Sequence, residues 1–137
     1  MSKKPNHPQK ILILSGSSEM ARSIVVDKLL DDRKDLRHLA LEDLREVGEW
    51  EEDVTMEDVF GTMIACDCAK DELDKGHPIV ITCPSLYLIN TVRESMPTEV
   101  ITVHMGQNSD LDHDVDHIIE ATCSANQTCT FLHEILG

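Results

Sequence analysis

The chain has 137 residues, 41% of them hydrophobic, which is enough for one domain with one hydrophobic core. Acidic residues outnumber basic ones by 26 to 12, and the formal net charge is −14. This charge repels phosphate backbones and anionic membranes, so nucleic-acid binding is disfavoured. Only 3% of the residues are aromatic, which also argues against a stacking surface for bases.

The sequence favours a cytoplasmic location. It shows neither a secretory leader nor an apolar run of about 18 residues, so we expect no secretion and no membrane insertion. The five cysteines are an odd number without a C-x-x-C pair, and we expect reduced, mostly buried thiols. Residues 1–9 predict a loose lead-in, and residues 10–137 predict a single domain.

Strand and helix patterns alternate along the chain. Apolar runs typical of buried strands occupy residues 10–15, 36–41, 78–83, 100–105 and 117–121. Apolar positions at helical spacing occupy residues 20–32, 59–75, 86–95 and 128–136. Thr55 and Asp58 have the spacing of a capping box before the second helix. This alternation implies right-handed crossovers and a mainly parallel sheet of five strands between two helical layers.

The turn after the first strand is a candidate phosphate-binding loop. Residues 16–23 fit the pattern G-x-x-x-x-G-K-[ST] at Gly16 and Ser23, but Ala21 and Arg22 replace its second Gly and its Lys. We predict that this loop binds phosphate or nucleotide and that Ser23 ligates a metal ion. The candidate binding residues are Gly16, Ser17, Ser18, Ala21, Arg22 and Ser23. The alternative is a turn that only connects strand and helix.

With its elements in this order, the whole chain resembles the small P-loop kinases, especially the branch of polynucleotide kinases and zeta-toxin-like kinases. Residues 38–45 match that family's strand ending in acidic-acidic-x-Arg, and residues 75–86 match its glycine turn, buried strand and tail. The resemblance implies a P-loop NTPase-like α/β fold with ATP and Mg²⁺ as cofactors. It makes Glu42 the base on an acceptor hydroxyl and Arg45 the acceptor-binding cation. The alternative for this pair is a strand end with a capping salt bridge.

Departures from the family pattern predict weak or absent catalysis. Thr82 and Cys83 stand where members usually carry an Asp that organises Mg²⁺. Residues 106–116 replace an arginine-bearing lid with four aspartates, and no Lys or Arg follows Arg93. Loss of such an arginine costs about 10³-fold or more in rate.

We therefore expect at most residual phosphate or nucleotide binding, and a role in contacts with an unknown protein partner. The oligomeric state stays open. The alternative is an active ATP-dependent phosphotransferase that acts on a hydroxyl of a small molecule, a nucleotide or a polynucleotide. In that case Arg22 would bind the β/γ-phosphates and Ser23 would bind Mg²⁺, with cations lent by a neighbouring subunit.

Two other interpretations have less support. Ser15–Ser18 also resembles the phosphate turn of a flavodoxin-like fold, but the chain lacks the aromatic residues that would sandwich a flavin. Residues 110–117 crowd carboxylate and imidazole groups together, yet they lack the glycine-bearing spacing of a calcium loop. We expect a solvated acidic loop there.

Overall fold

The computed structural model describes residues 10–16, 19–44, 55–84, 86–96, 99–106, 115–120 and 123–137. Its strands are β1 (Ile11–Gly16), β2 (Arg37–Ala40), β3 (Ile79–Cys83), β4 (Val100–Met105) and β5 (His117–Ile119). Its helices are α1 (Glu19–Asp32), α2 (Met56–Asp74), α3 (Ile89–Ser95) and α4 (Ala125–Leu136), with 3-10 turns η1 (Leu41–Leu44) and η3 (Leu86–Leu88). The predicted elements are present with small shifts at their ends, and the predicted helix at 86–95 divides into η3 and α3.

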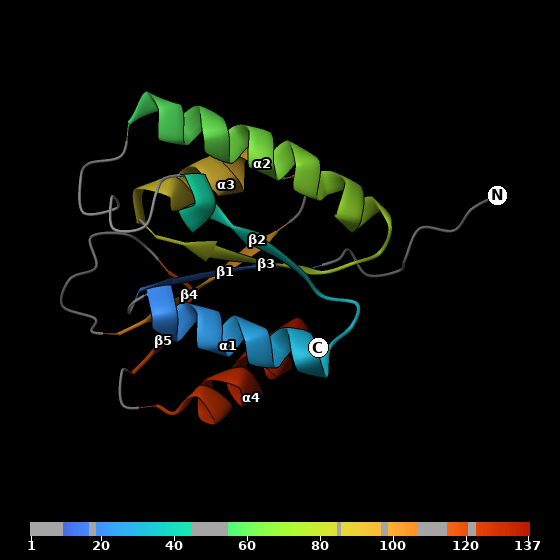
Figure 1. Ribbon diagram of the computed structural model, residues 1–137, viewed down its shortest axis with the longest axis vertical. Helices are drawn as coiled ribbons and strands as arrows, with labels where there is room; N and C mark the ends of the chain where they lie inside the picture. Colours follow the sequence, from blue (N-terminus) through green and yellow to red (C-terminus); the bar gives the residue numbers. More distant parts are fainter. Residues whose placement is uncertain are drawn as a thin grey trace.

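The strands form one sheet in the order β2-β3-β1-β4-β5, and each neighbouring pair is parallel. Helices α2 and α3 cover one face of this sheet, and α1 and α4 cover the other (Figure 1). The predicted three-layer α/β fold with a five-stranded parallel sheet is confirmed. Because all strands run the same way, their carboxyl ends meet at one edge, where ligands bind in open α/β sheets.

Strand β1 lies at the centre of the sheet and contributes to two hydrophobic cores. Ile11 and Ile13 pack into the core beneath α2 and α3, whereas Leu12 and Leu14 pack into the core beneath α1 and α4. All four side chains are fully buried. A parallel strand with both faces covered reads as a continuous apolar run, which explains why this strand was predictable.

Reciprocal capping boxes begin two of the helices. At α2, the Asp58 N–H donates to Thr55 Oγ1 at 3.3 Å, and the Thr55 N–H donates to Asp58 Oδ2 at 2.8 Å. At α4, Ser124 and Gln127 form the same pair of bonds, at 3.1 and 2.8 Å. These bonds satisfy backbone N–H groups that have no partner inside the helix, so they fix where each helix starts.

Several sequence predictions fall outside the described residues. They concern the lead-in at 1–9, the candidate ligands Ser17, Ser18 and Arg45, and most of the acidic loop at 106–116. Among the helices within the described ranges, none has both the length and the apolar character required to cross a bilayer.

The five cysteines are free thiols in two classes of environment. Cys66, Cys83 and Cys129 are buried, and Cys68 and Cys123 are exposed. Burial raises the pKa of the Cys66 thiol to about 11 and also raises the pKa of Cys129. The thiolate is the reactive form, so burial suppresses the reaction of these two thiols both sterically and by protonation.

We expect Cys68 and Cys123 to react with a maleimide at pH 8 well before the three buried cysteines. At this pH roughly one Cys66 in a thousand is a thiolate, given its pKa of about 11. Mass spectrometry of timed reactions measures the order, and labelling in denaturant must reach all five thiols. Early labelling of Cys66 in the folded protein would contradict the packing of α2.

Candidate phosphate-binding site

The candidate site lies at the carboxyl edge of the sheet, where β1, β2, β3 and β4 end side by side. Gly16 ends β1, Glu42 follows β2 in η1, Thr82 lies near the end of β3 and His104 near the end of β4. These residues are far apart in sequence. The parallel register places them close together, with Ser15 opposite both Cys83 and His104.

Gly16 turns the chain out of the sheet at a position that only glycine fits. Its φ is +82°, and a Cβ there would overlap the carbonyl oxygen of Met105 and lie 2.7 Å from His104 Cε1. The preceding residue is also held by β4, because Ser15 Oγ shares a hydrogen bond of 3.1 Å with His104 Nδ1. Packing against β4 therefore fixes the path by which the chain enters the candidate loop.

Helix α1 begins at Glu19, so two residues separate it from Gly16. The phosphate-binding pattern places four residues between its glycines, and here positions 19, 20 and 21 are helical. Of the four positions between the two glycines of the pattern, only 17 and 18 therefore lie between β1 and α1. The start of α1 carries the partial positive charge of a helix N-terminus, which favours anions.

Arg22 is buried and turned toward the protein. Its side chain is 5% exposed. Nε donates to Glu42 Oε2 at 3.0 Å, and Nη1 donates to the carbonyl oxygen of Gly16 at 2.7 Å. The residue that replaces the phosphate-binding lysine therefore forms a buried ion pair with the residue predicted to be the catalytic base.

The second oxygen of Glu42 is also occupied. Thr82 Oγ1 donates to Glu42 Oε1 at 2.7 Å, and His38 Nε2 lies 2.9 Å from Thr82 Oγ1. Because the hydroxyl proton of Thr82 points to the carboxylate, we assign His38 Nε2 as the donor to Thr82. Burial lowers the pKa of His38 despite the nearby carboxylates of Glu42, Asp43 and Asp27. The ring is therefore predominantly neutral at neutral pH. We call Arg22, Glu42, Thr82 and His38 the Arg22–Glu42 network.

The structure brings together only part of the predicted site. Gly16, Arg22 and Glu42 are in direct contact, whereas Ser23 is exposed on α1. Thr82 was predicted only as the position where an aspartate is missing, and His38 only as part of a strand. The signal that links them is the parallel register, which sets Ala40 beside Thr82 and His38 beside Val80.

The described side chains do not fit a magnesium site in this arrangement. Glu42 uses both oxygens for protein contacts, and Thr82 donates its proton rather than offering a carboxylate. Across the described ranges, no three His, Cys, Asp or Glu side chains gather closely enough to hold a metal ion.

Solved structures with the same architecture cover almost the whole chain. A sugar kinase from Janibacter sp. HTCC2649 matches with a TM-score of 0.69 at 13% identity, over 93% of this chain and 94% of that one. The APS kinase of Mycobacterium tuberculosis, in complex with AMPPNP and APS, matches with a TM-score of 0.63 at 13% identity, over 94% and 98% of the chains. The chain has the P-loop kinase fold.

A gluconokinase from Sinorhizobium meliloti 1021 shares this P-loop kinase fold, with a TM-score of 0.55 at 11% identity and 94% coverage of both chains. No family model and no curated protein sequence matches the chain. At these identities the likeness concerns the fold and does not select a branch of the P-loop kinases.

Breaking the Arg22–Glu42 pair will destabilise the protein strongly. Arg22→Ala leaves a buried carboxylate without its cation, and Glu42→Ala leaves a buried guanidinium without its anion. We expect each variant to lose about 3–5 kcal/mol of unfolding free energy, and the double variant to lose less than the sum. Urea denaturation measures these free energies.

The matched control is Arg33→Ala, which removes an ion pair of similar length on the surface. Arg33 Nη2 lies 3.1 Å from Asp35 Oδ2, and the two side chains are 20% and 50% exposed. We expect this variant to cost less than about 1 kcal/mol. Equal losses for the Arg22 and Arg33 variants would show that the Arg22–Glu42 pair is not a buried constraint.

A second prediction separates close packing from backbone strain at Gly16. Gly16→Ala adds a Cβ that overlaps Met105, whereas Gly76→Ala meets nothing within 4 Å at a similar φ of +90°. We expect Gly76→Ala to cost about 1–3 kcal/mol of stability through φ alone, and Gly16→Ala to cost clearly more. Chemical denaturation of both variants compares them, and equal losses would contradict the packing against β4.

Proposed function

We propose that this chain is a P-loop-kinase-fold protein with weak or absent phosphotransferase activity. In this proposal it retains at most phosphate or nucleotide binding at the start of α1 and acts through contacts with another protein. The five free thiols are compatible with action in the cytoplasm, where thiols stay reduced. The proposal rests mainly on the contacts of Arg22.

The supporting observation is that the two residues with predicted chemical roles bind each other. Arg22 uses Nε to bind Glu42 and Nη1 to bind the Gly16 carbonyl, so these two donors are already engaged within the protein. A carboxylate that already accepts from Arg22 and Thr82 has both oxygens engaged when an acceptor hydroxyl would arrive. In this ion pair, Glu42 competes with phosphate for Arg22, and Arg22 competes with an acceptor hydroxyl for Glu42.

Electrostatics over the rest of the chain support the same conclusion. Phosphoryl transfer depends on cations positioned against the charge that develops on the transferring group. The sequence has no Lys or Arg after Arg93, and the net charge is −14. Cations for such a transition state would have to come from the amino-terminal two thirds of the chain or from another subunit.

The alternative is an active phosphotransferase, and the extent of the fold likeness favours it. Kinases that include one solved with AMPPNP and APS match over nearly their whole length. In this alternative Arg22 leaves Glu42 to bind the β/γ-phosphates, and the released Glu42 acts as the base. Ser23 then ligates Mg²⁺, and Arg45 binds the acceptor.

Titration calorimetry and turnover assays distinguish the two hypotheses. We expect Mg²⁺-ATP and Mg²⁺-GTP to bind no more tightly than about 1 mM, and we expect no ATP consumption with a panel of sugar, nucleotide and oligonucleotide acceptors. Turnover that disappears in Arg22→Ala would overturn the proposal. Because Arg22→Ala also destabilises the fold, Ser23→Ala serves as a second variant at an exposed position.

Glu42→Gln tests the ion pair more directly, because the two hypotheses predict opposite effects. If Glu42 competes with phosphate for Arg22, neutralising it strengthens the binding of inorganic phosphate or ATP. If Glu42 is the base of an active enzyme, the same variant loses turnover. Circular dichroism confirms that each variant is folded before binding and turnover are compared.

A further inference from the structure

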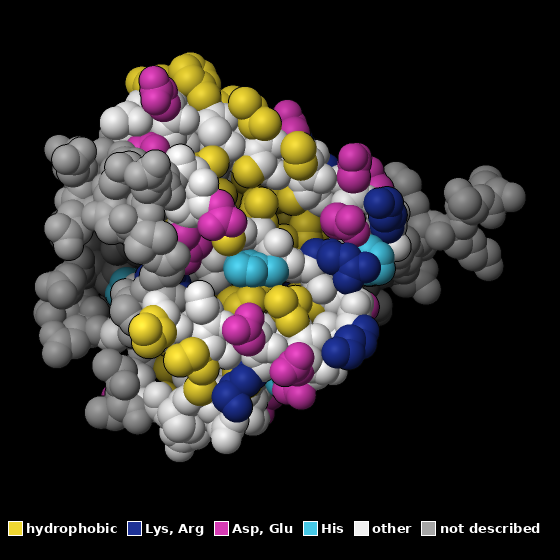
Figure 2. All heavy atoms as spheres, in the orientation of Figure 1, with side chains coloured by type: hydrophobic (Ala, Val, Ile, Leu, Met, Phe, Trp, Pro, Cys, Tyr) yellow, Lys and Arg dark blue, Asp and Glu magenta, His cyan; other side chains and the backbone are white. Residues whose placement is uncertain are grey.

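The outward side of α2 carries an apolar surface that the protein itself leaves open. Its residues Met56, Phe60, Met63 and Ile64 are 64%, 55%, 45% and 65% exposed. Their spacing places them on one side of the helix, opposite the buried Asp58, Thr62, Cys66 and Ala69. We call these four exposed residues the α2 stripe. Figure 2 shows hydrophobic side chains gathered along α2 at the top of the molecule.

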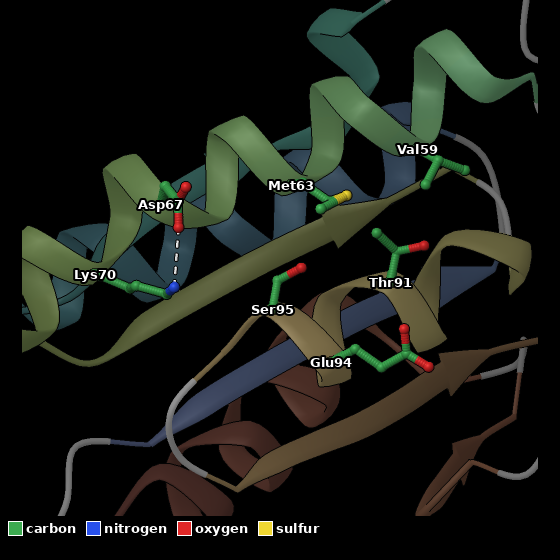
Figure 3. Close-up of a pocket in the computed structure, with 7 residues that line it drawn as sticks. All are labelled: Val59, Met63, Asp67, Lys70, Thr91, Glu94 and Ser95. Atoms are coloured by element: carbon green, nitrogen blue, oxygen red, sulfur yellow. Dashed lines mark hydrogen bonds and ion pairs between the residues drawn. The ribbon is translucent and has the colours of Figure 1, made fainter.

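A groove between α2 and α3 continues this surface. It has a volume of about 390 Å³, and Met63 belongs to both the groove and the α2 stripe. In Figure 3, Val59 and Met63 of α2 lie across the groove from Thr91 and Ser95 of α3. Apolar side chains on one wall and small polar ones on the other make a concave, adaptable surface.

The margin of this surface is acidic. Asp67, Glu94 and Lys70 line the groove, and α2 as a whole has six acidic residues and one lysine. That lysine, Lys70, forms an ion pair with Asp67, with Nζ 2.9 Å from Oδ1. A basic partner would therefore gain attraction at the margin of the groove. A second copy of this chain carries a charge of −14 and would be repelled.

We infer that the α2 stripe and the α2–α3 groove bind a basic amphipathic helix of a partner protein. Positions 56, 60, 63 and 64 give the i, i+4, i+7 and i+8 spacing that meets the apolar side of a helix along about two turns. Lysines and arginines beside that apolar side would face Asp67 and Glu94. This inference rests on the part of the proposed function that assigns protein contacts, and it names their surface and chemistry.

A designed peptide pair tests this inference without knowledge of the natural partner. The probe is a fluorescent helix of leucines and lysines about 15 residues long, with leucines along one side, and its counterpart has glutamate for every lysine. We expect fluorescence anisotropy to show binding of the basic peptide at least about tenfold tighter than that of the acidic peptide. Equal binding, or none, would overturn the inference.

The variants separate apolar docking from general charge attraction. Ile64→Asp and Phe60→Asp change the α2 stripe, and Ile24→Asp makes the same chemical change on α1, where Ile24 is 46% exposed. Each adds one negative charge, so charge alone predicts slightly tighter binding to the basic peptide in all three. We expect the two α2 variants to weaken binding about tenfold or more and Ile24→Asp to leave it within about twofold. Equal effects at α1 and α2 would overturn the inference.

Two further measurements complete the test. We expect sedimentation of the unliganded protein to show no self-association through this surface. A dimer that Phe60→Asp dissociates would assign the surface to a second copy of this chain and overturn the inference. Backbone NMR shifts on peptide addition should concentrate in α2 and α3, and shifts centred on α1 would overturn the inference. These experiments use no nucleotide, so a negative peptide result would not change the proposal of weak catalysis. In the same way, turnover in the kinase assays would not change the interpretation of peptide binding.

Discussion

The ion pair between Arg22 and Glu42 joins the start of α1 to the end of β2 at the edge where ligands bind in this fold. Both side chains are almost fully buried, and the pair extends through Thr82 to His38 on one side and to the Gly16 carbonyl on the other. A buried charge is tolerated only when it is paired and hydrogen-bonded. These contacts engage Arg22 and Glu42, for which the sequence predicted phosphate binding and base catalysis.

At the carboxyl edge of the sheet in this P-loop kinase fold, the charged and polar side chains of the candidate site bind one another. Parallel strands bring their carboxyl ends together whatever residues they carry, so the architecture survives when the chemistry at that edge changes. In this chain an arginine and a glutamate meet there, and each neutralises the other.

The outward side of α2 lies on the far side of a helical layer from the sheet, and it carries a different kind of chemistry. Its buried side builds the core with β1 and β3, while its exposed side shows methionine, phenylalanine and isoleucine next to carboxylates. We propose macromolecular contact for this side because negative charge lies next to exposed apolar area there.

The sequence by itself determined the elements, their order and the fold class. Periodicity and capping are local properties, so the buried run at 11–14 and the box at Thr55 and Asp58 were predictable. The glycine and arginine of the loop could also be identified as candidates by pattern. Only the tertiary structure decided that Arg22 meets Glu42 and that His104 packs against Gly16. These contacts depend on the register between strands distant in sequence, and no local pattern encodes that register.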